Sequence, residues 1–494
     1  MQFLKDLQLF FYGLHCPTIF RPRSQPYPFG SSIANQTRDL TWVAMSTGME
    51  GRMAQASKGG STAVVPLYLV KAYYFASFCY FATYVRYATL YFEAEGFSAS
   101  QIGCVIGVTK ALTTLVTPLW NALADRTRRA RTLQQVALLL SAAPFLTLAV
   151  PLREESLRFP LRAVAYWGFA VLGAPNSSMM DALARAACAQ DADSWGKARM
   201  YGAVGWGLMH LLLGSLFDHL GFKIMFRSYL ISGTLLFVVT RCGMPEACGK
   251  AQGKVNFHSV LGILVRNRVF FGNIVFLGSG FSMVENMLFL VLEEMQASTL
   301  LCGFSVFVTV IFELPIFAYA QPLLKRLGTR NMIILGQAAW VVRAVFYSRM
   351  STPWTVLLIE PLHGVTFALV WTAATDHVAS PAVCPEGLEA SAQGLLRASF
   401  MGVGPLIGLC SAGLLFDTVG GHFAYFIFSI LVLLSGLVYW LNGEPEAPRS
   451  HKGAQIAPSE RAGEIRPNPV IFGGGHASEC AGVLTTSKPP EGAS

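Results

Sequence analysis

Apolar segments of about twenty residues recur along the chain between residues 66 and 441, and short polar connections separate them. This is the length that a helix needs to cross the hydrocarbon core of a bilayer. Lipid offers the backbone no hydrogen-bond partners, so segments of this kind are expected to be helical. The pattern predicts spans at 66–92, 100–123, 132–150, 162–185, 200–217, 224–242, 267–292, 298–320, 331–348, 354–377, 393–416 and 421–441.

A central connection at 243–266 is longer and more polar than most of the others, and it divides the twelve predicted spans into six and six. Each half also places a basic turn after its second span, in LWNALADRTRRARTL at 119–133 and AQPLLKRLGTRNMII at 320–334. Internal repeats are typical of alternating-access carriers. We therefore predict an all-α integral membrane protein with twelve transmembrane helices, in an N-terminal half at 63–242 and a C-terminal half at 267–441, joined by a cytoplasmic loop at 243–266.

Polar tails flank the predicted membrane domain. Residues 1–62 are rich in Pro, Ser, Gly, Gln and Arg, and the apolar run at 7–14 is too short to span a bilayer. A targeting segment is an alternative for this tail, although Lys5 and Asp6 precede the run and no clear small-residue cleavage site follows it. Residues 442–494 contain too few apolar residues to form a core. We expect both tails to be disordered.

The composition excludes several other classes of protein. Of 494 residues, 53% are hydrophobic and only 13% are charged, which is fewer than soluble domains carry. The net charge of +9 does not indicate a nucleic-acid partner, because the basic residues lie in short loops and tails rather than on one face. Ten cysteines form no CxxC pair and no metal-ligand cluster with histidine. We expect no cofactor, no metal and no nucleic acid, and a monomer whose partners are the lipid bilayer, a small solute and protons.

Charge alternates between successive loops, and this predicts the orientation of the chain. The connections after the second and eighth spans and the central loop are basic, whereas the first and seventh connections are acidic. Cytoplasmic loops carry the excess of Lys and Arg, so both termini are expected to be cytoplasmic, in the plasma membrane or an organelle membrane. The basic residues are Arg126, Arg128, Arg129, Arg131, Lys250, Lys254, Arg266, Arg268, Lys325, Arg326 and Arg330, and the acidic residues are Glu93, Glu95, Glu293 and Glu294.

Ionisable residues interrupt the predicted spans, at a cost of at least about 2.5 to 3.5 kcal/mol for each charge at bilayer depth. Lys71 is close enough to a membrane face to extend its head group there, and His210 is expected to bond only a backbone carbonyl. The interior candidates are Lys71, Arg86, Lys110, Asp181, His210, Glu285, Glu313, Arg343, Glu360, His363 and Arg397.

The C-terminal half contains the candidates with the clearest chemistry. Glu313 and Arg343 lie inside successive spans, where a structural salt bridge and a role in solute or proton handling both remain open. Glu360 and His363 are three residues apart, so they are expected to share a helix face. Histidine changes protonation near neutral pH more easily than other side chains, which makes a proton relay plausible here.

The segment LADRTRRAR after the second span resembles the loop signature of the major facilitator superfamily. Asp125 takes the acidic position, and Arg126, Arg128 and Arg129 take the basic ones. The usual leading Gly is Asn121, and Arg128 replaces a later Gly. The resemblance implies the major facilitator fold and a latch that these residues form on the cytoplasmic side in one state.

Residues 174–214 resemble the fourth-to-fifth span region of the lactose permeases. The resemblance implies that Asp181 and Arg199 hold the solute and that Trp206 stacks beneath it. The chemistry is suitable, since a carboxylate can orient the rigid Arg donors and solute hydroxyls can accept from them. The alternative is that Arg199 is only a positive-inside residue and Trp206 an interfacial anchor.

The resemblance to the permeases continues in the second half, through FELPIFAYAQPLLKRLGTRN, VVRAVFYS and LIEPLHGVTFALVW. Two of these phrases, FELPIF and LHGVTFAL, look closer to eukaryotic major-facilitator associated-domain proteins and to bacterial phenylpropionate and nucleoside symporters. Two positions depart from the permeases. Thr366 replaces their proton-carrying Glu, and Glu360 replaces a Lys. The residues left for proton coupling and charge compensation are Glu285, Glu313, Arg343, Glu360 and His363.

These features predict a secondary transporter that moves a small polar organic solute, such as a sugar, nucleoside or aromatic acid, together with protons. A facilitated uniporter and a receptor or scaffold that kept the carrier fold are the alternatives. A membrane enzyme is not expected, because the sequence contains no HExxH, GxSxG or phosphate-loop motif and no catalytic set at one depth.

Overall fold

A computed structural model describes residues 65–188, 192–246, 257–385 and 387–442, and all regular secondary structure in these ranges is helical. The all-helical prediction is therefore confirmed for the described residues. The predicted N-terminal tail, 1–62, lies outside the described residues. The predicted C-terminal tail, 442–494, also lies outside them, apart from Asn442.

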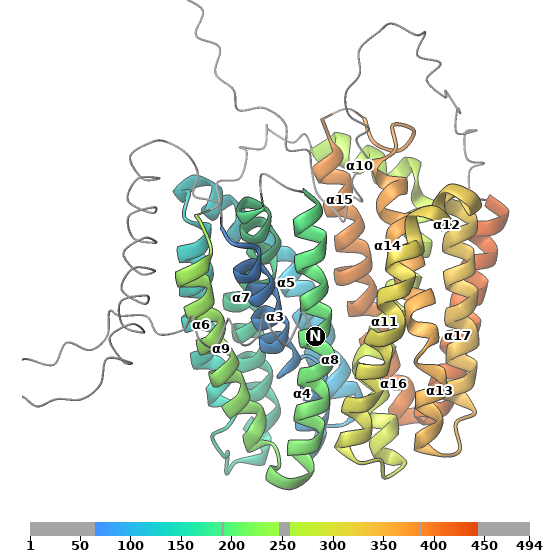
Figure 1. Cartoon of the computed structure of the whole chain (residues 1–494). Helices are drawn as coiled ribbons and strands as arrows, with labels where there is room; N and C mark the ends of the chain where they lie inside the picture. Colours follow the sequence, from blue (N-terminus) through green and yellow to red (C-terminus); the bar gives the residue numbers. More distant parts are fainter. Residues whose placement is uncertain (1–64, 189–191, 247–256, 386, 443–494) are drawn as a thin grey trace, which may run out of the picture.

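The helices of the N-terminal part pack into one group, which is coloured blue to green in Figure 1. Within this first group α3 packs against α8 and α9, and α7 packs against α5 and α6. Its members are α3 (Leu67–Ala82), α4 (Tyr87–Ala94), α5 (Ala99–Thr127), α6 (Ala130–Thr147), α7 (Glu155–Ala187), α8 (Ala192–Leu220) and α9 (Lys223–Gly243).

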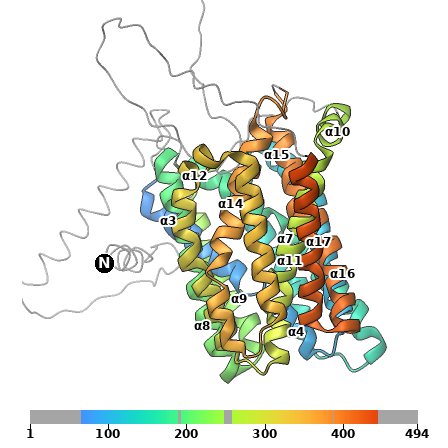
Figure 2. The ribbon, with the colours of Figure 1, turned by 90° about the vertical axis from the view of Figure 1, so that its right-hand side faces the viewer.

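The later helices form a second group beside the first, and Figure 2 views the molecule from this side. Within it α12 packs against α14 and α17, and α11 packs against α16 and α17. Its members are α11 (Arg268–Glu294), α12 (Thr299–Ser348), η1 (Pro353–Thr355), α13 (Val356–Ile359), α14 (Leu362–Ala379), α15 (Glu389–Arg397), η2 (Ala398–Val403), α16 (Gly404–Val419) and α17 (Gly421–Asn442).

Every span that the hydrophobic pattern predicts coincides with helix in the structure. By length and hydropathy, seven described helices can cross a membrane, or eight if the bent pair 353–359 and 362–379 is one span. The number is below twelve because α3 and α4 are individually short, α6 and α7 are not apolar enough over eighteen residues, and α12 joins two predicted spans across Gly328, which is itself non-helical. The twelve-span count stays a prediction.

One segment of the predicted central loop is helical. Helix α10 (Phe257–Arg266) begins inside that loop and packs against α15, and both lie near one end of the bundle in Figure 1. Ile263 is buried, whereas Leu261 and Val265 are exposed, so the helix has a buried and an exposed face. Residues 247–256 of the loop lie outside the described residues.

Irregular turns interrupt the membrane-length segments at three places that carry a charged residue. Arg86 lies at the break between α3 and α4, and Glu360 lies at the 45° bend between α13 and α14. Arg397 is the last residue of α15, directly before the π-helix η2. Broken and π-helical turns in membrane proteins often occur at functional sites, because they free backbone groups and redirect side chains.

The two groups meet along two tight helix crossings, α5 against α16 and α8 against α12. A Cβ atom on Gly103 would lie 2.2 Å from the carbonyl oxygen of Leu409, and one on Gly303 would lie 2.2 Å from that of His210. Only glycine permits this backbone approach, as at other close crossings of membrane helices. These crossings therefore bring the two groups into direct backbone contact.

Next to each crossing, an aspartate from one group caps the N-terminus of a helix in the other. The Asp417 carboxylate accepts from two α5 amides, and the Asp218 carboxylate accepts from two α12 amides and one hydroxyl. These contacts define what we call the closed end of the molecule. The donors are Ala99 N and Ser100 N, both at 2.9 Å, for Asp417, and Thr299 N at 2.9 Å, Leu300 N at 3.1 Å and Thr299 Oγ1 at 2.6 Å for Asp218.

The sequence repeats this arrangement. LFDHLG at 216–221 and LFDTVG at 415–420 carry the two aspartates, and Gly214 and Gly413 lie four residues before them. On the facing helices, Ser98 and Ser298 are the N-caps, and their hydroxyls accept from the amides three residues further on. The two interfaces thus share the glycine, the aspartate and the serine N-cap, whereas the capped residues differ.

Candidate functional site

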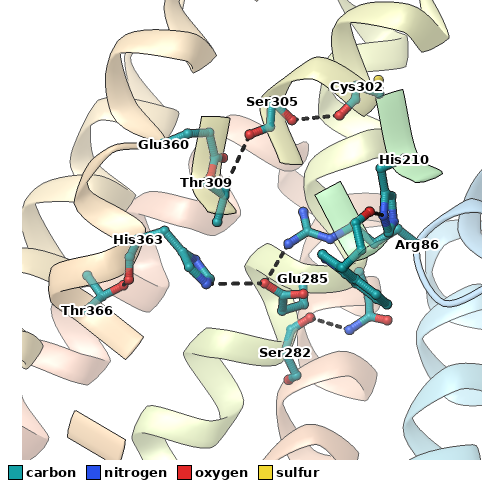
Figure 3. A network of polar contacts seen from close by, with 12 residues as sticks. Arg86, His210, Ser282, Glu285, Cys302, Ser305, Thr309, Glu360, His363 and Thr366 are labelled. Carbon is teal, nitrogen blue, oxygen red and sulfur yellow. Dashed lines mark hydrogen bonds and ion pairs between the residues drawn. The ribbon is translucent and has the colours of Figure 1, made fainter. Parts of the chain in front are cut away.

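A polar network lies where the two groups face each other, and Figure 3 shows its centre. Arg86 Nη2 donates to Glu285 Oε1 at 2.6 Å, which joins the break between α3 and α4 to α11. Arg86 is 2% exposed, and its Nε and Nη1 atoms have no hydrogen-bond partner among the described residues. Glu285 is 29% exposed, so the ion pair is buried on one side and reachable on the other.

His363 extends the network from the other side of Glu285. Its Nε2 atom lies 3.9 Å from Glu285 Oε1, and its Nδ1 atom lies 2.8 Å from Arg343 Nη1. Arginine can only donate, so Nδ1 accepts and the ring proton of a neutral His363 is on Nε2, facing Glu285. The arrangement places a transferable proton opposite a carboxylate.

Arg343 and Glu360 form the deepest ion pair, with both side chains fully buried and Nη2 2.7 Å from Oε2. Tyr347 and Thr309 donate to the two Glu360 oxygens at 2.7 and 2.6 Å, and Arg343 Nε donates to the Tyr347 hydroxyl. A buried pair is tolerated when further hydrogen bonds satisfy it in this way. Arg343 therefore pairs with Glu360, whereas the sequence left a bridge to Glu313 open.

Glu313 and Lys110 lie around this centre. Neither side chain makes a hydrogen bond or salt bridge within the described part of the chain, but both interact electrostatically with Glu285. Glu313 also interacts with Arg86, Arg199 and Arg343. The predicted charge network of the second half is thus gathered around Glu285, with Arg86 and Lys110 added from the first group.

Asp181 and Arg199 form a second polar centre between α7 and α8. Arg199 Nη1 donates to Asp181 Oδ1 at 2.6 Å, and the Tyr74 hydroxyl donates to the same oxygen at 2.7 Å. Trp195 Nε1 donates to the Tyr74 hydroxyl at 2.8 Å. Arg199 keeps 34% of its side-chain surface exposed, against 15% for Asp181, so the pair remains reachable from outside.

The structure places a different indole beside Arg199 from the one that the sequence suggested. The Arg199 guanidinium lies 5.8 Å from the Trp195 ring centre, whereas Trp206 packs against Phe78 and His210. Trp195 and Arg199 are four residues apart on α8, so helical spacing could have indicated the contact. The stacking role of Trp206 remains a prediction.

His210 has the ordinary surroundings that the sequence suggested, whereas the expected extension of Lys71 to a membrane face stays a prediction. His210 Nδ1 lies 2.8 Å from the carbonyl oxygen of Trp206, which confirms the expected backbone bond. Lys71 Nζ lies 4.8 Å from the centre of the Tyr201 ring, a cation–π distance.

The predicted loop latch lies at the end of α5, away from the closed end. Asp125 is half-buried and Arg126, Arg128 and Arg129 are exposed, and none of the four side chains makes a hydrogen bond or ion pair with a described residue. The neighbouring Arg131 instead bonds Glu246, within the first group.

Comparison with known proteins supplies independent information on the chain. The MFS_1 like family matches residues 67–427. The uncharacterized transporter YwbF of Bacillus subtilis is 24% identical over 393 residues, which cover 78% of this chain and 96% of YwbF. The maltose permease of Geobacillus stearothermophilus is 25% identical over 409 residues, which cover 80% of this chain and 98% of the permease.

Among solved structures, the nucleoside transporter NupG superposes with a TM-score of 0.63. The match covers 76% of this chain and 98% of NupG at 16% identity. At this identity the likeness concerns the fold alone. No group of three or more His, Cys, Asp or Glu side chains suited to a metal ion occurs in the described ranges.

Proposed function

Because the chain belongs to the MFS_1 like family, and so to the major facilitator superfamily, we propose that it is a secondary transporter that moves a small polar organic solute by alternating access. It is an integral, multi-pass membrane protein whose relatives are named as transporters. We further propose that protons drive the transport. The observation that carries the proposal is the Arg86–Glu285 ion pair, which joins the two groups of helices at the polar centre between them.

The proposed architecture is twelve spans in two six-helix halves, with both termini cytoplasmic. The halves are 63–242 and 267–441, so the first and second groups of helices each supply one of them. In this orientation the closed end faces away from the cytoplasm, and the basic loop at Arg128 faces the cytoplasm. Rocking of the halves about the central network would open the closed end and bring the Asp125 loop into its latched position.

Glu285 is the proposed proton site. It accepts from Arg86 of the first half and faces the Nε2 atom of His363 of the second half. A proton on Glu285 removes the charge that holds Arg86, so it loosens this ion pair between the halves. Solute movement and proton movement are then linked, because the halves separate at the centre only after Glu285 is neutralised.

Solute binding is assigned to Asp181 and Arg199, with Trp206 as a stacking surface. Asp181 orients the Arg199 guanidinium, which leaves the remaining Arg199 donors available. Glu313, Arg343, Glu360 and His363 compensate charge on the opposite half. Arg343 and Glu360 serve as a fixed support, since their hydrogen bonds are already filled and both are fully buried.

The proposal is tested by uptake of radiolabelled sugars, nucleosides and aromatic acids into proteoliposomes that contain the purified full chain, with and without a pH gradient. We expect one solute class to accumulate, and Arg199→Lys to reduce uptake at least tenfold by loss of the bidentate fork. Arg227→Lys, at an exposed position of α9, is the matched control. Normal uptake by Arg199→Lys would remove Arg199 from the binding site.

The same uptake assay distinguishes the proposed transporter from two alternatives, a facilitated uniporter and a non-transporting receptor. Uptake that equilibrates but never exceeds the external concentration, whatever the pH gradient, indicates a uniporter. Binding of a solute without uptake indicates a receptor or scaffold that kept the carrier fold.

A further inference from the structure

Ten ionisable side chains in and beside the interface between the two groups of helices form one electrostatically connected set, which we call the interior charge set. Both groups of helices contribute to it, and each member interacts with at least one other by an ion pair or at longer range. The bases are Arg86, Lys110, Arg185, Arg199, Arg343 and Arg397, and the acids are Asp181, Glu285, Glu313 and Glu360.

This set holds six bases and four acids, so it carries two positive charges that its own carboxylates do not balance. His363 adds no negative charge, and Lys71, which lies over the Tyr201 ring, is a further base. Uncompensated charge between membrane helices is costly, and it is normally offset by a partner or by a ligand. The imbalance therefore indicates what kind of ligand the interior favours.

We propose that the solute is an organic anion and that its carboxylate binds between Arg199 and Arg397. This inference rests on the proposed transport function and narrows its substrate from polar solutes in general to carboxylates. The two arginines come from opposite groups of helices, from α8 and from the end of α15. A carboxylate that bridges them therefore also links the two groups.

Availability distinguishes these two arginines from the others in the set. Arg343 is fully buried, and its donors are occupied by Tyr347, His363 and Glu360. Arg199 is one-third exposed and uses Nη1 for Asp181. Arg397 is exposed and makes no hydrogen bond or ion pair with the part of the chain that the structure describes, although Asp181 and Arg199 are near enough to interact with it electrostatically.

Local structure supports the position of the Arg199 side chain. The Arg185 and Arg199 guanidinium groups lie 5.6 and 5.8 Å from the Trp195 ring centre, which fixes their planes. Arg397 directly precedes the π-helix η2, where the helix axis is displaced and a side chain can be redirected.

A buried aromatic residue, Phe400, follows Arg397 on the same segment and packs beside the half-buried rings of Trp371 and Phe367. Phe400 of η2 packs against Trp371, with ring centres 5.6 Å apart, and Trp371 stacks on Phe367 at 6.2 Å. An apolar body attached to the carboxylate would find aromatic contacts here. Arginine forks bind carboxylates through two parallel hydrogen bonds, so a neutral analogue with the same body loses both the bonds and the charge balance.

The test is thermal stabilisation of the purified full chain in detergent by acids and their own amides. The probes are 3-phenylpropionate, benzoate and succinate, each against its amide, with maltose and uridine as neutral polar solutes. We expect at least one acid to stabilise the protein and its amide to fail. Arg199→Gln and Arg397→Gln should each weaken the apparent affinity for that acid about tenfold or more, and Arg227→Gln should leave it unchanged.

Stabilisation by maltose or uridine together with none by the acids overturns the inference, as does an acid whose affinity survives in both arginine variants. Absence of stabilisation by all three acids also counts against it. Measuring the flux of the same probes into proteoliposomes tests the transport function separately from the carboxylate site. An acid that binds but is never transported contradicts the transport function alone, and maltose flux without acid binding contradicts the carboxylate site alone.

Discussion

The two ends of the molecule differ in the contacts that their aspartate side chains make. At the closed end Asp218 and Asp417 each accept from backbone amides of the opposite group of helices. At the other end Asp125 has no partner among the described residues, and the nearby Arg131–Glu246 pair stays within the first group. Described aspartate contacts thus join the two groups at the closed end, whereas the Asp125 loop makes none, as the proposed alternating-access cycle expects for one of its two states.

The aspartate contacts that join the two groups of helices at the closed end are individually weak. Asp218 and Asp417 are exposed, and a capping carboxylate at a helix N-terminus contributes about 1 kcal/mol. Contacts of this strength close an interface reversibly, whereas the fully buried Arg343–Glu360 pair is expected to persist through the cycle. In the proposed cycle, burial therefore distinguishes the contacts that are expected to stay fixed from those that are expected to open.

The largest effect is expected at the glycine crossings. Gly303→Val and Gly103→Val place a branched side chain where a Cβ alone would lie 2.2 Å from a backbone oxygen, so the closed end cannot form and uptake should fall to background. Gly272→Ala is the matched control, because its Cβ meets nothing within 4 Å. Uptake near the wild-type level in Gly303→Val would show that this crossing is not needed for closure.

The second-largest effect is expected at the two aspartates that cap helix N-termini. Asp218→Ala and Asp417→Ala should each speed hydrogen exchange of the capped amides at the start of α12 and of α5 about fivefold, since each removes about 1 kcal/mol. The two effects should be similar because the two contacts repeat each other. Thr418→Ala, whose hydroxyl bonds only its own helix, is the control. Unchanged exchange in both aspartate variants would contradict the capping role.

Asp125→Asn should affect the other end only. We expect stability to change by less than about 0.5 kcal/mol, because the carboxylate has no described partner in this state. Uptake should nevertheless slow severalfold, since the loop must latch when the closed end opens. Thermal unfolding and uptake of the same preparation separate the two effects, and an unaltered uptake rate would count against the latch.

The smallest effect is expected for Glu246→Gln, which removes the ion pair that stays within the first group. Its side chains are 27% and 31% exposed, so the loss should be at most about 1 kcal/mol and should shrink at high salt. Thermal unfolding at low and high salt measures it. A loss of several kcal/mol, or a loss of uptake without destabilisation, would place this pair in the transport cycle.

Hydropathy was sufficient to locate the helical segments, because each predicted span lies on a helix. It could not show where helices break. Pro361 is a visible signal for the bend at Glu360, since proline ends a helix at the preceding residue, whereas the break before Arg86 has no such marker. Each break carries a charged side chain that forms an ion pair with another helix, and no local pattern indicates these partners.

The sequence predicted a pair of interacting residues only where the resemblance to a known family placed both partners. Asp181 and Arg199 were placed together by resemblance, and the structure brings them to 2.6 Å. The repeated LFD motifs are visible in the sequence, but their partner amides are 81 and 318 residues away, so no local pattern indicates the contact. Trp195 was missed because the resemblance pointed to Trp206, further along the same helix.

Proton movement in proteoliposomes tests the central claim most directly, namely that solute and proton movement are coupled at Glu285. A pulse of the transported solute should alkalinise a weakly buffered external medium for the wild-type chain. For Glu285→Gln, exchange of labelled for unlabelled solute should continue while the alkalinisation disappears. Solute flux with no external pH change in the wild type, or unchanged alkalinisation in Glu285→Gln, would contradict the account.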